Sequence, residues 1–361
     1  MNKKVMVAMS GGVDSSAAAL LLQQQGYDIC GVTLSLYSND DILQTSEEKT
    51  CCSLDDVEDA RRVCTKLGVD HFVFNMKQQF REKVIDTFAN SYKIGETPNP
   101  CIECNRHIKF SGVLNRAEQL GFDMIATGHY VISEYDPAAE RWILRRAVDP
   151  NKDQSYVLYV LTQDMLSKTL FPLGGLNKSQ IREIAEQHEL INARKRESQD
   201  ICFVPDGDYA AFLIKKLGVK TKNGKFVDTE GKTLGEHKGI IRYTIGQRRG
   251  LGVSADRRLF VIDKNIKENK IILGDEPLLF KNRMWVRDVN WVSIKPPNGK
   301  VLAQVKSRYR QNAQSAVLHP MENGVLVEFE QPQRALTTGQ AAVFYDGDVV
   351  LGGGTISPFE E

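Results

Sequence analysis

The chain has 361 residues, more than one hydrophobic core usually holds, so we expect two or three domains. Its 42% hydrophobic and 26% charged residues are typical of a globular protein, and a net charge of +1 neither favours nor excludes a nucleic-acid partner. No apolar stretch is long enough for a signal core or a membrane span, so we expect a cytoplasmic protein without membrane contact. The seven cysteines, an odd number, argue against a disulfide framework.

The N-terminal segment predicts a phosphate-binding loop. An apolar strand, Val5–Met9, runs into Ser10–Ser15 (Ser-Gly-Gly-Val-Asp-Ser) and then into a helix. Two glycines let backbone N–H groups converge, and the helix N-terminus adds its unpaired N–H groups and dipole. The lysine of the common nucleoside-triphosphate loop is missing, and Asp14 beside phosphates requires a bridging Mg²⁺ unless it caps the helix. The loop resembles that of ATP pyrophosphatases; a plain Gly-rich turn is the alternative.

Strands and helices alternate beyond this loop. This order predicts a doubly wound parallel sheet of α/β class, with ligands at the carboxyl edge, where Ser10–Ser15 and Thr127–Tyr130 both lie. A mostly helical stretch, 155–190, closes a first domain that we expect to span residues 1–204. The strands are expected at 27–36, 69–75 and 123–129, and the helices at 55–67, 80–92 and 108–120.

Two further domains are predicted from a change of pattern. Short β runs with Gly turns indicate a small β-rich linking domain at residues 205–280, and alternation of period two indicates an antiparallel β-barrel at 281–361. Between Lys281 and Pro320 eight basic residues stand against one acid, with aromatic residues interleaved. This patch predicts RNA binding by the barrel; the alternative is a solvated basic sheet face.

The cysteines suggest sulfur or redox chemistry. Cys101 and Cys104 lie three residues apart just before a helix, where the dipole favours a thiolate at Cys104, and Cys202 is a remote third thiol. A single C-x-x-C is a weak zinc signal, so we expect no structural metal site. The adjacent pair Cys51-Cys52 is interpreted as incidental, and Cys30 and Cys64 as core residues.

Six motifs occur together in this order, namely Ser10–Ser15, Asn99–Cys104, Thr127–Tyr130, Lys152–Ser155, Ser198–Cys202 and Tyr243–Gly252. With them the whole chain resembles tRNA-specific 2-thiouridylases of the bacterial and mitochondrial type, which belong to the PP-loop ATP pyrophosphatases. The resemblance implies replacement of O2 of the wobble uridine by sulfur in tRNAs for Lys, Glu and Gln, after adenylation by ATP with Mg²⁺. It also implies two partners: the tRNA anticodon arm, and a sulfur donor such as a cysteine desulfurase or a sulfur relay protein.

The resemblance also implies residue roles. Cys202 carries a persulfide, and Cys104 is the paired nucleophile that releases sulfide or resolves a disulfide. The ATP site is formed by Ala8, Met9, Ser10, Gly11, Gly12, Val13, Asp14, Ser15, Leu34 and Gly128. The target base lies among Asn99, Pro100, Cys101 and His129, and other tRNA contacts come from Lys152, Asp153, Gln154, Arg308, Tyr309 and Gln340.

One residue departs from the pattern of the family, and other mechanisms and functions stay open. Many members carry an aspartate, proposed as general acid or base, where this chain has Cys101. Three thiols, Cys101, Cys104 and Cys202, could instead hold a four-iron four-sulfur cluster with one open iron. A PP-loop amide-forming synthetase would explain the phosphate loop but neither the basic barrel nor the cysteines. A catalytically silent RNA-binding or iron-sensing protein would not explain an intact phosphate loop.

Overall fold

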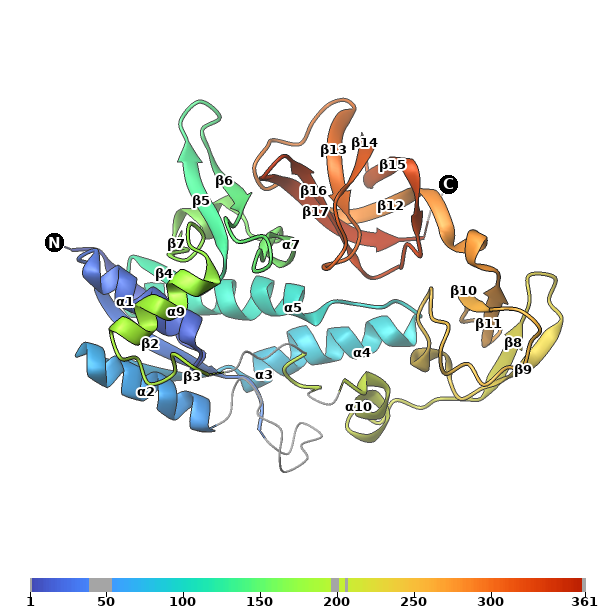
Figure 1. The fold of residues 1–361 in the computed structure, drawn as a ribbon, viewed down its shortest axis with the longest axis horizontal. Coiled ribbons are helices and arrows are strands. Elements are labelled where there is room, and N and C mark those ends of the chain that lie inside the picture. The colour runs from blue at the N-terminus through green and yellow to red at the C-terminus, as the bar shows by residue number, and fades with distance from the viewer. Residues whose placement is uncertain (1, 39–53, 196–200, 205–206, 359–361) are drawn as a thin grey trace.

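The computed structural model describes residues 2–38, 54–195, 201–204 and 207–358. The pair Cys51-Cys52 and the motif residues Ser198, Gln199 and Asp200 lie outside this part of the chain. Figure 1 shows an N-terminal α/β part, a small β-rich part and a C-terminal barrel. None of the described helices is long and apolar enough to cross a membrane.

A five-stranded parallel sheet forms the centre of the N-terminal part. Its order is β3-β2-β1-β4-β7, and β1 pairs in register with both neighbours, Val7 lying opposite Gly31 and Ala126. Val5, Met6 and Val7 are fully buried, as expected of a strand covered on both faces. The doubly wound parallel sheet is therefore confirmed. Its strands are β1 (Lys4–Ala8), β2 (Asp28–Ser35), β3 (His71–Asn75), β4 (Met124–Thr127) and β7 (Thr169–Leu170).

Helices cover the two faces of this sheet and form separate apolar cores. Val5 and Val7 face a core with α1 (Val13–Gln24) and α2 (Leu54–Leu67), whereas Met6 faces the larger core of the other side. That side holds α3 (Lys77–Phe80), η2 (Arg81–Ile85), α4 (Asp86–Lys93), α5 (Pro100–Glu103), η3 (Cys104–Phe110) and α6 (Ser111–Gln119). Further helices are α7 (Ser155–Leu158), α8 (Gln163–Ser167) and α9 (Lys178–Gln187), which contacts α1.

The helix predicted at 108–120 begins eight residues earlier, at Pro100. Asn99 is the N-cap, since its Oδ1 accepts the N–H of Cys101 at 3.1 Å, and proline is favoured at the next position because it needs no N–H partner there. Asn99-Pro100 was the local signal for this start. The helical run is π-helical from Cys104 to Phe110, a form that is often found at functional sites.

The linking part contains a four-stranded sheet of order β10-β11-β8-β9. Phe226, Val261, Ile271 and Leu273 form its buried centre. Its elements are α10 (Tyr209–Lys215), β8 (Gly224–Val227), β9 (Thr233–His237), η4 (Ile240–Arg242), β10 (Phe260–Asn265), β11 (Lys270–Gly274) and η5 (Glu276–Leu279).

The C-terminal part is a closed antiparallel barrel, as predicted. Six strands follow the order β12-β15-β14-β13-β16-β17, and pairing of β17 with β12 closes the barrel. Alternation of period two at 301–309, 316–319, 324–329 and 341–345 predicted the four middle strands, but not the first and the last. The strands are β12 (Phe280–Asn290), β13 (Val301–Lys306), β14 (Gln314–Met321), β15 (Gly324–Arg334), β16 (Ala341–Asp346) and β17 (Val349–Ser357).

A hairpin that the sequence analysis missed connects the two large parts. It consists of β5 (Val131–Asp136) and β6 (Arg141–Arg146), and it follows β4 directly. Val349 of β17 pairs with Arg145 of β6, so the hairpin extends the barrel sheet (Figure 1). The proposed boundaries at residues 204 and 280 stay predictions, because the N-terminal part contributes strands to the C-terminal sheet.

Candidate active site

The predicted phosphate loop lies at the carboxyl end of β1, the central strand. Gly11 has a left-handed φ of 71°, and Gly12 is the N-cap of α1 without a side-chain capping bond. The first N–H groups of the helix are therefore not capped by a side chain, which suits an anionic ligand. Ser15 shapes the turn, since its Oγ accepts the N–H of Ser10 at 3.1 Å and donates to Gly12 O at 3.1 Å.

Two residues from far along the chain brace Gly11. The Nδ2 of buried Asn192 donates to Gly11 O at 3.1 Å, and Lys195 Nζ lies 3.3 Å from the same oxygen. Lys195 also forms ion pairs with Asp56 at 2.7 Å and Asp59 at 2.6 Å. A Cβ on Gly11 would lie 2.4 Å from the backbone oxygen of Asp56, so only glycine fits this turn.

Asp14 is held by a lysine that the loop itself lacks. Lys178 Nζ, at the start of α9, lies 2.7 Å from Asp14 Oδ1, and the Tyr130 hydroxyl donates to the same oxygen at 2.6 Å. The lysine side chain is only 13% exposed. Sequence analysis missed Lys178 because 164 residues separate it from Asp14 and no local motif marks it. The fold thus places a cation beside the predicted phosphate site.

The loop after β4 packs directly on the phosphate loop. A Cβ on Gly128 would lie 2.8 Å from the backbone nitrogen of Ser15, so a glycine is needed for this close approach. His129 is buried, and its Nδ1 lies 2.9 Å from Thr127 Oγ1. Burial lowers the pKa of His129, followed by the charge of Lys109, so the imidazole is neutral. The predicted nucleotide contact of Gly128 and base contact of His129 stay predictions.

Leu34, near the carboxyl end of β2, is the last of the predicted nucleotide residues. Its side chain is buried in the core on the face opposite α1. A contact of Leu34 with adenine would therefore use its backbone. In an open parallel sheet the carboxyl ends of neighbouring strands face one crevice, which places Leu34 and the phosphate loop on the same edge.

Cys104 and Cys202 adjoin one apolar core. Cys104, at the start of η3, is 6% exposed and belongs to this core, while partly buried Cys202 packs against it. The Tyr37 hydroxyl donates to Cys202 O at 2.9 Å, and Phe203 packs on Phe80 with ring centroids 5.8 Å apart. Both thiols therefore adjoin the same large core, although they are nearly 100 positions apart; their catalytic roles stay predictions.

The helix dipole acts on Cys101 more than on Cys104. Because the helical run begins at Pro100, Cys101 lies in its first turn, whereas Cys104 is its fifth residue. The field of a helix end falls off within one turn, so the expected dipole effect on Cys104 is weaker than the sequence suggested. Cys101 is exposed, in contrast to Cys104.

The three cysteines do not form the arrangement that an iron-sulfur cluster requires. Among the residues described, no group of three or more His, Cys, Asp or Glu side chains is placed to hold a metal ion. Cys101, Cys104 and Cys202 all belong to this described part. A four-iron cluster needs its thiolates around one centre, so the observed arrangement does not fit the cluster alternative.

The motif Lys152–Ser155 lies where the α/β part meets the barrel. Asp153 carboxylate oxygens accept the N–H of Ser155 at 3.1 Å and its hydroxyl at 2.8 Å, and Gln154 Oε1 accepts the N–H of Tyr130 at 2.9 Å. Ser155 Oγ in turn lies 3.2 Å from the hydroxyl of Tyr345 in β16. The side chains of Asp153 and Gln154 therefore shape this junction, and the predicted tRNA contacts of Lys152, Asp153 and Gln154 stay predictions.

Arg308 spans the barrel and the linking part. Its Nη2 lies 2.8 Å from Ala335 O, 2.9 Å from Thr337 Oγ1 and 3.5 Å from Ile245 O. The predicted phosphate contact is untested, but this nitrogen already donates to protein. Tyr309, by contrast, is 41% exposed. Burial raises the pKa of Tyr309, with smaller contributions from Asp153 and Cys101, which places this ring in the electrostatic range of Cys101.

Gln340 connects the barrel to the segment that leads to the cysteines. Its Nε2 donates to Thr97 O at 2.6 Å, and Thr97 N–H donates to Thr338 O at 2.8 Å. Gly339, at a left-handed φ of 86°, leaves no room for a Cβ because one would lie 2.7 Å from Glu96 Cβ. These contacts hold the barrel against the segment that directly precedes Asn99. The tRNA contact predicted for Gln340 stays a prediction.

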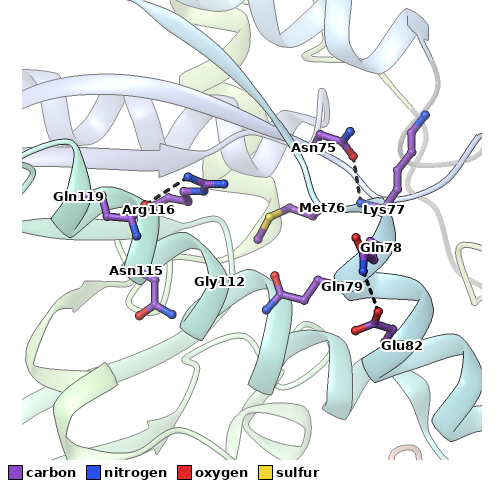
Figure 2. Close-up of a pocket in the computed structure, with 10 residues that line it drawn as sticks. All are labelled: Asn75, Met76, Lys77, Gln78, Gln79, Glu82, Gly112, Asn115, Arg116 and Gln119. Carbon is purple, nitrogen blue, oxygen red and sulfur yellow. Dashed lines mark hydrogen bonds between the residues drawn. The ribbon is translucent and has the colours of Figure 1, made fainter.

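A cavity of about 560 Å³ lies elsewhere, between the end of β3 and α6 (Figure 2). Five of its ten lining residues carry amide side chains, and Gln78 donates to Glu82 at 3.0 Å along one wall. None of the predicted site residues lines this cavity. The cavity is therefore separate from the phosphate loop and from Cys101, Cys104 and Cys202.

A parallel sheet with a Gly-Gly phosphate loop on its central strand defines a nucleotide-binding α/β protein of the PP-loop class, followed by two β-rich parts. Family models agree: a tRNA methyl transferase HUP domain matches residues 3–206, a tRNA methyl transferase PRC-barrel domain 210–275 and an aminomethyltransferase beta-barrel domain 281–356.

Curated relatives match over almost the whole chain. The tRNA-specific 2-thiouridylase MnmA of Clostridioides difficile (strain 630) is 49% identical over 357 residues, covering 99% of this chain and 98% of that protein. The protein of the same name from Caldicellulosiruptor saccharolyticus is 47% identical, covering 99% of each. The chain therefore belongs to the tRNA-specific 2-thiouridylase family, as its six motifs predicted.

Proposed function

We propose that this chain is an ATP-dependent tRNA sulfurtransferase that converts the wobble uridine of tRNAs for Lys, Glu and Gln into 2-thiouridine. The observation that carries the proposal is the match with relatives of that name over 99% of the chain. In this proposal the phosphate loop and the thiols of Cys104 and Cys202 supply the two chemistries that such a reaction needs.

Adenylation is the first step in this proposal. The uridine O2 attacks the α-phosphorus of ATP, and pyrophosphate leaves into the loop formed by residues 8–15. AMP on O2 turns a poor leaving group into a good one and makes C2 open to attack. The N–H groups at the start of α1 and the ammonium of Lys178 stabilise the phosphate charge, and Mg²⁺ would be held at Asp14.

Sulfur transfer follows. A donor protein leaves a persulfide on Cys202, whose outer sulfur attacks C2 and displaces AMP. Cys104 thiolate then attacks the Cys202 sulfur, so the electron pair of the old S–S bond goes to the sulfur on C2. Alternatively, Cys104 attacks the persulfide first and releases hydrosulfide, which attacks C2. Both routes end in a Cys104–Cys202 disulfide that an external thiol must reduce.

The test is a reaction of the full chain with unmodified tRNA, ATP, Mg²⁺ and cysteine plus a cysteine desulfurase. Mass spectrometry of the wobble nucleoside and pyrophosphate release are followed separately. Cys202→Ser should lose persulfide labelling and thiouridine, whereas Cys104→Ser should accept the persulfide and still form no thiouridine. Cys101→Ser is the matched control, with a loss of at most about tenfold if the thiol only supports proton transfer. Thiouridine formed by Cys202→Ser would overturn the assignment.

A further inference from the structure

The motif Tyr243–Gly252 is shared with the family, and the proposed chemistry does not use it. The structure places it on the linking part, between η4 and β10, where backbone bonds hold it firmly. Gly246 N–H donates to Val261 O at 2.8 Å, and Val261 N–H donates to Gln247 O at 2.9 Å. The Gln247 side chain spans the turn, accepting from Thr244 N–H and donating to Arg249 O, both at 3.0 Å.

This ordered turn presents its arginines to solvent. Tyr243 and Leu251 are buried in the core of the linking part, while Arg248 and Arg249 are exposed. Gly250 and Gly252 have left-handed φ values of 75° and 68°, which allow the chain to turn sharply around the inward Leu251. The backbone is therefore fixed independently of the arginine side chains.

The charge of the surrounding stretch is strongly positive. Residues 238–258 contain six basic residues and one acid, in a chain whose net charge is only +1. Arg257 forms an ion pair with Asp275 at 3.3 Å. Arg248, Arg249 and Arg258, which we call the arginine loop, are exposed and form no ion pair with any residue that the structure describes.

The basic patch predicted on the barrel is, by comparison, partly neutralised. Arg283 pairs with Glu328 at 2.6 Å, and Arg287 pairs with Glu96 at 3.0 Å. Part of the positive charge of the barrel patch is therefore paired within the protein, and the arginine loop adds positive charge outside the region that composition singled out.

The chemistry of the arginine loop favours phosphate over a protein surface. Guanidinium groups bind phosphate oxygens through paired N–H donors. Protein interfaces are centred on buried aromatic or aliphatic anchors, and residues 247–258, all of which are described, expose no large apolar side chain.

The motif that carries this loop is also connected to the barrel. Arg308 contacts Ile245 O, within the same motif, and the hydroxyl of the next residue, Tyr309, donates to Asp153 O at 3.3 Å. The motif that carries Arg248 and Arg249 therefore adjoins the barrel edge at which Arg308 and Tyr309 are predicted to contact tRNA.

We propose that the arginine loop binds backbone phosphates of the substrate tRNA outside its anticodon loop. This inference rests on the proposed function for the identity of the RNA. Phosphate contacts carry affinity but no base information, so the loop contributes to tRNA binding in general and not to the choice among tRNAs.

The test is the salt dependence of tRNA binding by the full chain carrying Arg248→Gln, Arg249→Gln and Arg258→Gln together. Each lost phosphate contact should lower the slope of log Kd against log salt by roughly 0.7–0.9, so about two units are expected for the triple variant. Affinity should fall at least about tenfold at moderate salt, while single-turnover thiolation at saturating tRNA should stay unchanged. Lys222→Gln, Lys225→Gln and Lys232→Gln together, on β8, its preceding loop and the turn before β9, remove the same charge and should leave the slope intact.

The outcomes separate this inference from the proposed function. An unchanged slope in the arginine variant, with thiouridine formed by the wild type, would overturn the phosphate contact and leave the function standing. A reduced slope in a protein that forms no thiouridine would support the contact and overturn the function. If the arginine variant receives sulfur from the donor protein more slowly, while its slope of log Kd for tRNA against log salt is unchanged, the loop binds a protein and the inference is overturned.

Discussion

Removal of the Lys178 ammonium tests whether the fold supplies the cation that the phosphate loop lacks. Its Nζ lies 2.7 Å from Asp14 Oδ1, and the two side chains are 13% and 28% exposed. Lys178→Met keeps an unbranched side chain, one heavy atom shorter, and removes the ammonium group. Two consequences are expected: a loss of transition-state stabilisation when ATP is cleaved, and a partly buried carboxylate left without its ammonium partner.

The two consequences differ in size. Loss of one preorganised donor to a developing anion costs roughly 10²–10³ in rate, so pyrophosphate release should fall by that factor. An exposed ion pair contributes about 0–1 kcal/mol and breaking a buried one costs about 3–5, so this intermediate pair should contribute about 2 kcal/mol to folding. The rate effect is therefore the larger one and identifies the role.

The assay is tRNA-dependent pyrophosphate release, with thermal unfolding measured in parallel. Lys178→Met should lose both rate and stability, and Lys178→Arg should retain most of each. When Asp14→Asn is added to Lys178→Met, stability should recover because no charge is left unpaired, but the rate should not. A Lys178→Met enzyme within about threefold of the wild-type rate, or a rate recovered in the double variant, would refute a role in phosphate binding.

Three further changes have defined outcomes. Gly128→Ala places a Cβ 2.8 Å from Ser15 N and should weaken ATP binding by about 1–3 kcal/mol, seen as a higher KM for ATP. The control is Gly121→Ala, which strains the backbone but meets no neighbour within 4 Å and should leave KM unchanged. Arg308→Ala removes bonds to Ala335 O and Thr337 Oγ1 and should lower unfolding stability by about 1–3 kcal/mol; a weakened tRNA affinity at unchanged stability would assign it to phosphate instead. Burial lowers the pKa of Lys264 from 10.5 to about 8, so at this group the unfolded chain binds more protons than the folded chain between these values, which contributes a rise of stability with pH. Lys264→Met should remove that contribution, so its unfolding free energy in urea should rise less, or fall more, between pH 8 and 10.5 than that of the wild type.

Local signals in the sequence were sufficient to predict the phosphate loop and the class of fold. Ser10–Ser15 combines a turn that requires glycine with a helix start, and both features depend on adjacent residues. The parallel sheet followed from alternating strands and helices in the same way. The start of the helix at Pro100 could also have been predicted, since Asn99 is a good N-cap and proline is favoured directly after it.

Contacts between distant residues could not be predicted in this way. Lys178, Asn192 and Lys195 complete the phosphate loop from the far end of the α/β part, and no spacing rule connects them to Gly11 or Asp14. The resemblance implied a tRNA contact for Arg308, in agreement with the basic stretch around it, but the sequence does not reveal that carbonyl oxygens of the folded chain already accept from its guanidinium. Such contacts depend on tertiary packing, which one sequence does not encode in a readable pattern.

The hairpin β5–β6 has a consequence for how the chain is made. Its partner strand β17 lies about 200 residues further along, since Arg145 pairs with Val349. A ribosome adds about 5–20 residues per second, so β17 is synthesised roughly 10–40 s after β6. During this time the outer edge of the hairpin has no partner strand. During synthesis an unpaired strand edge is a site for wrong association between nascent chains. Truncation before β17 should therefore expose this edge permanently, and chains stalled late in translation should be more prone to aggregate than completed ones.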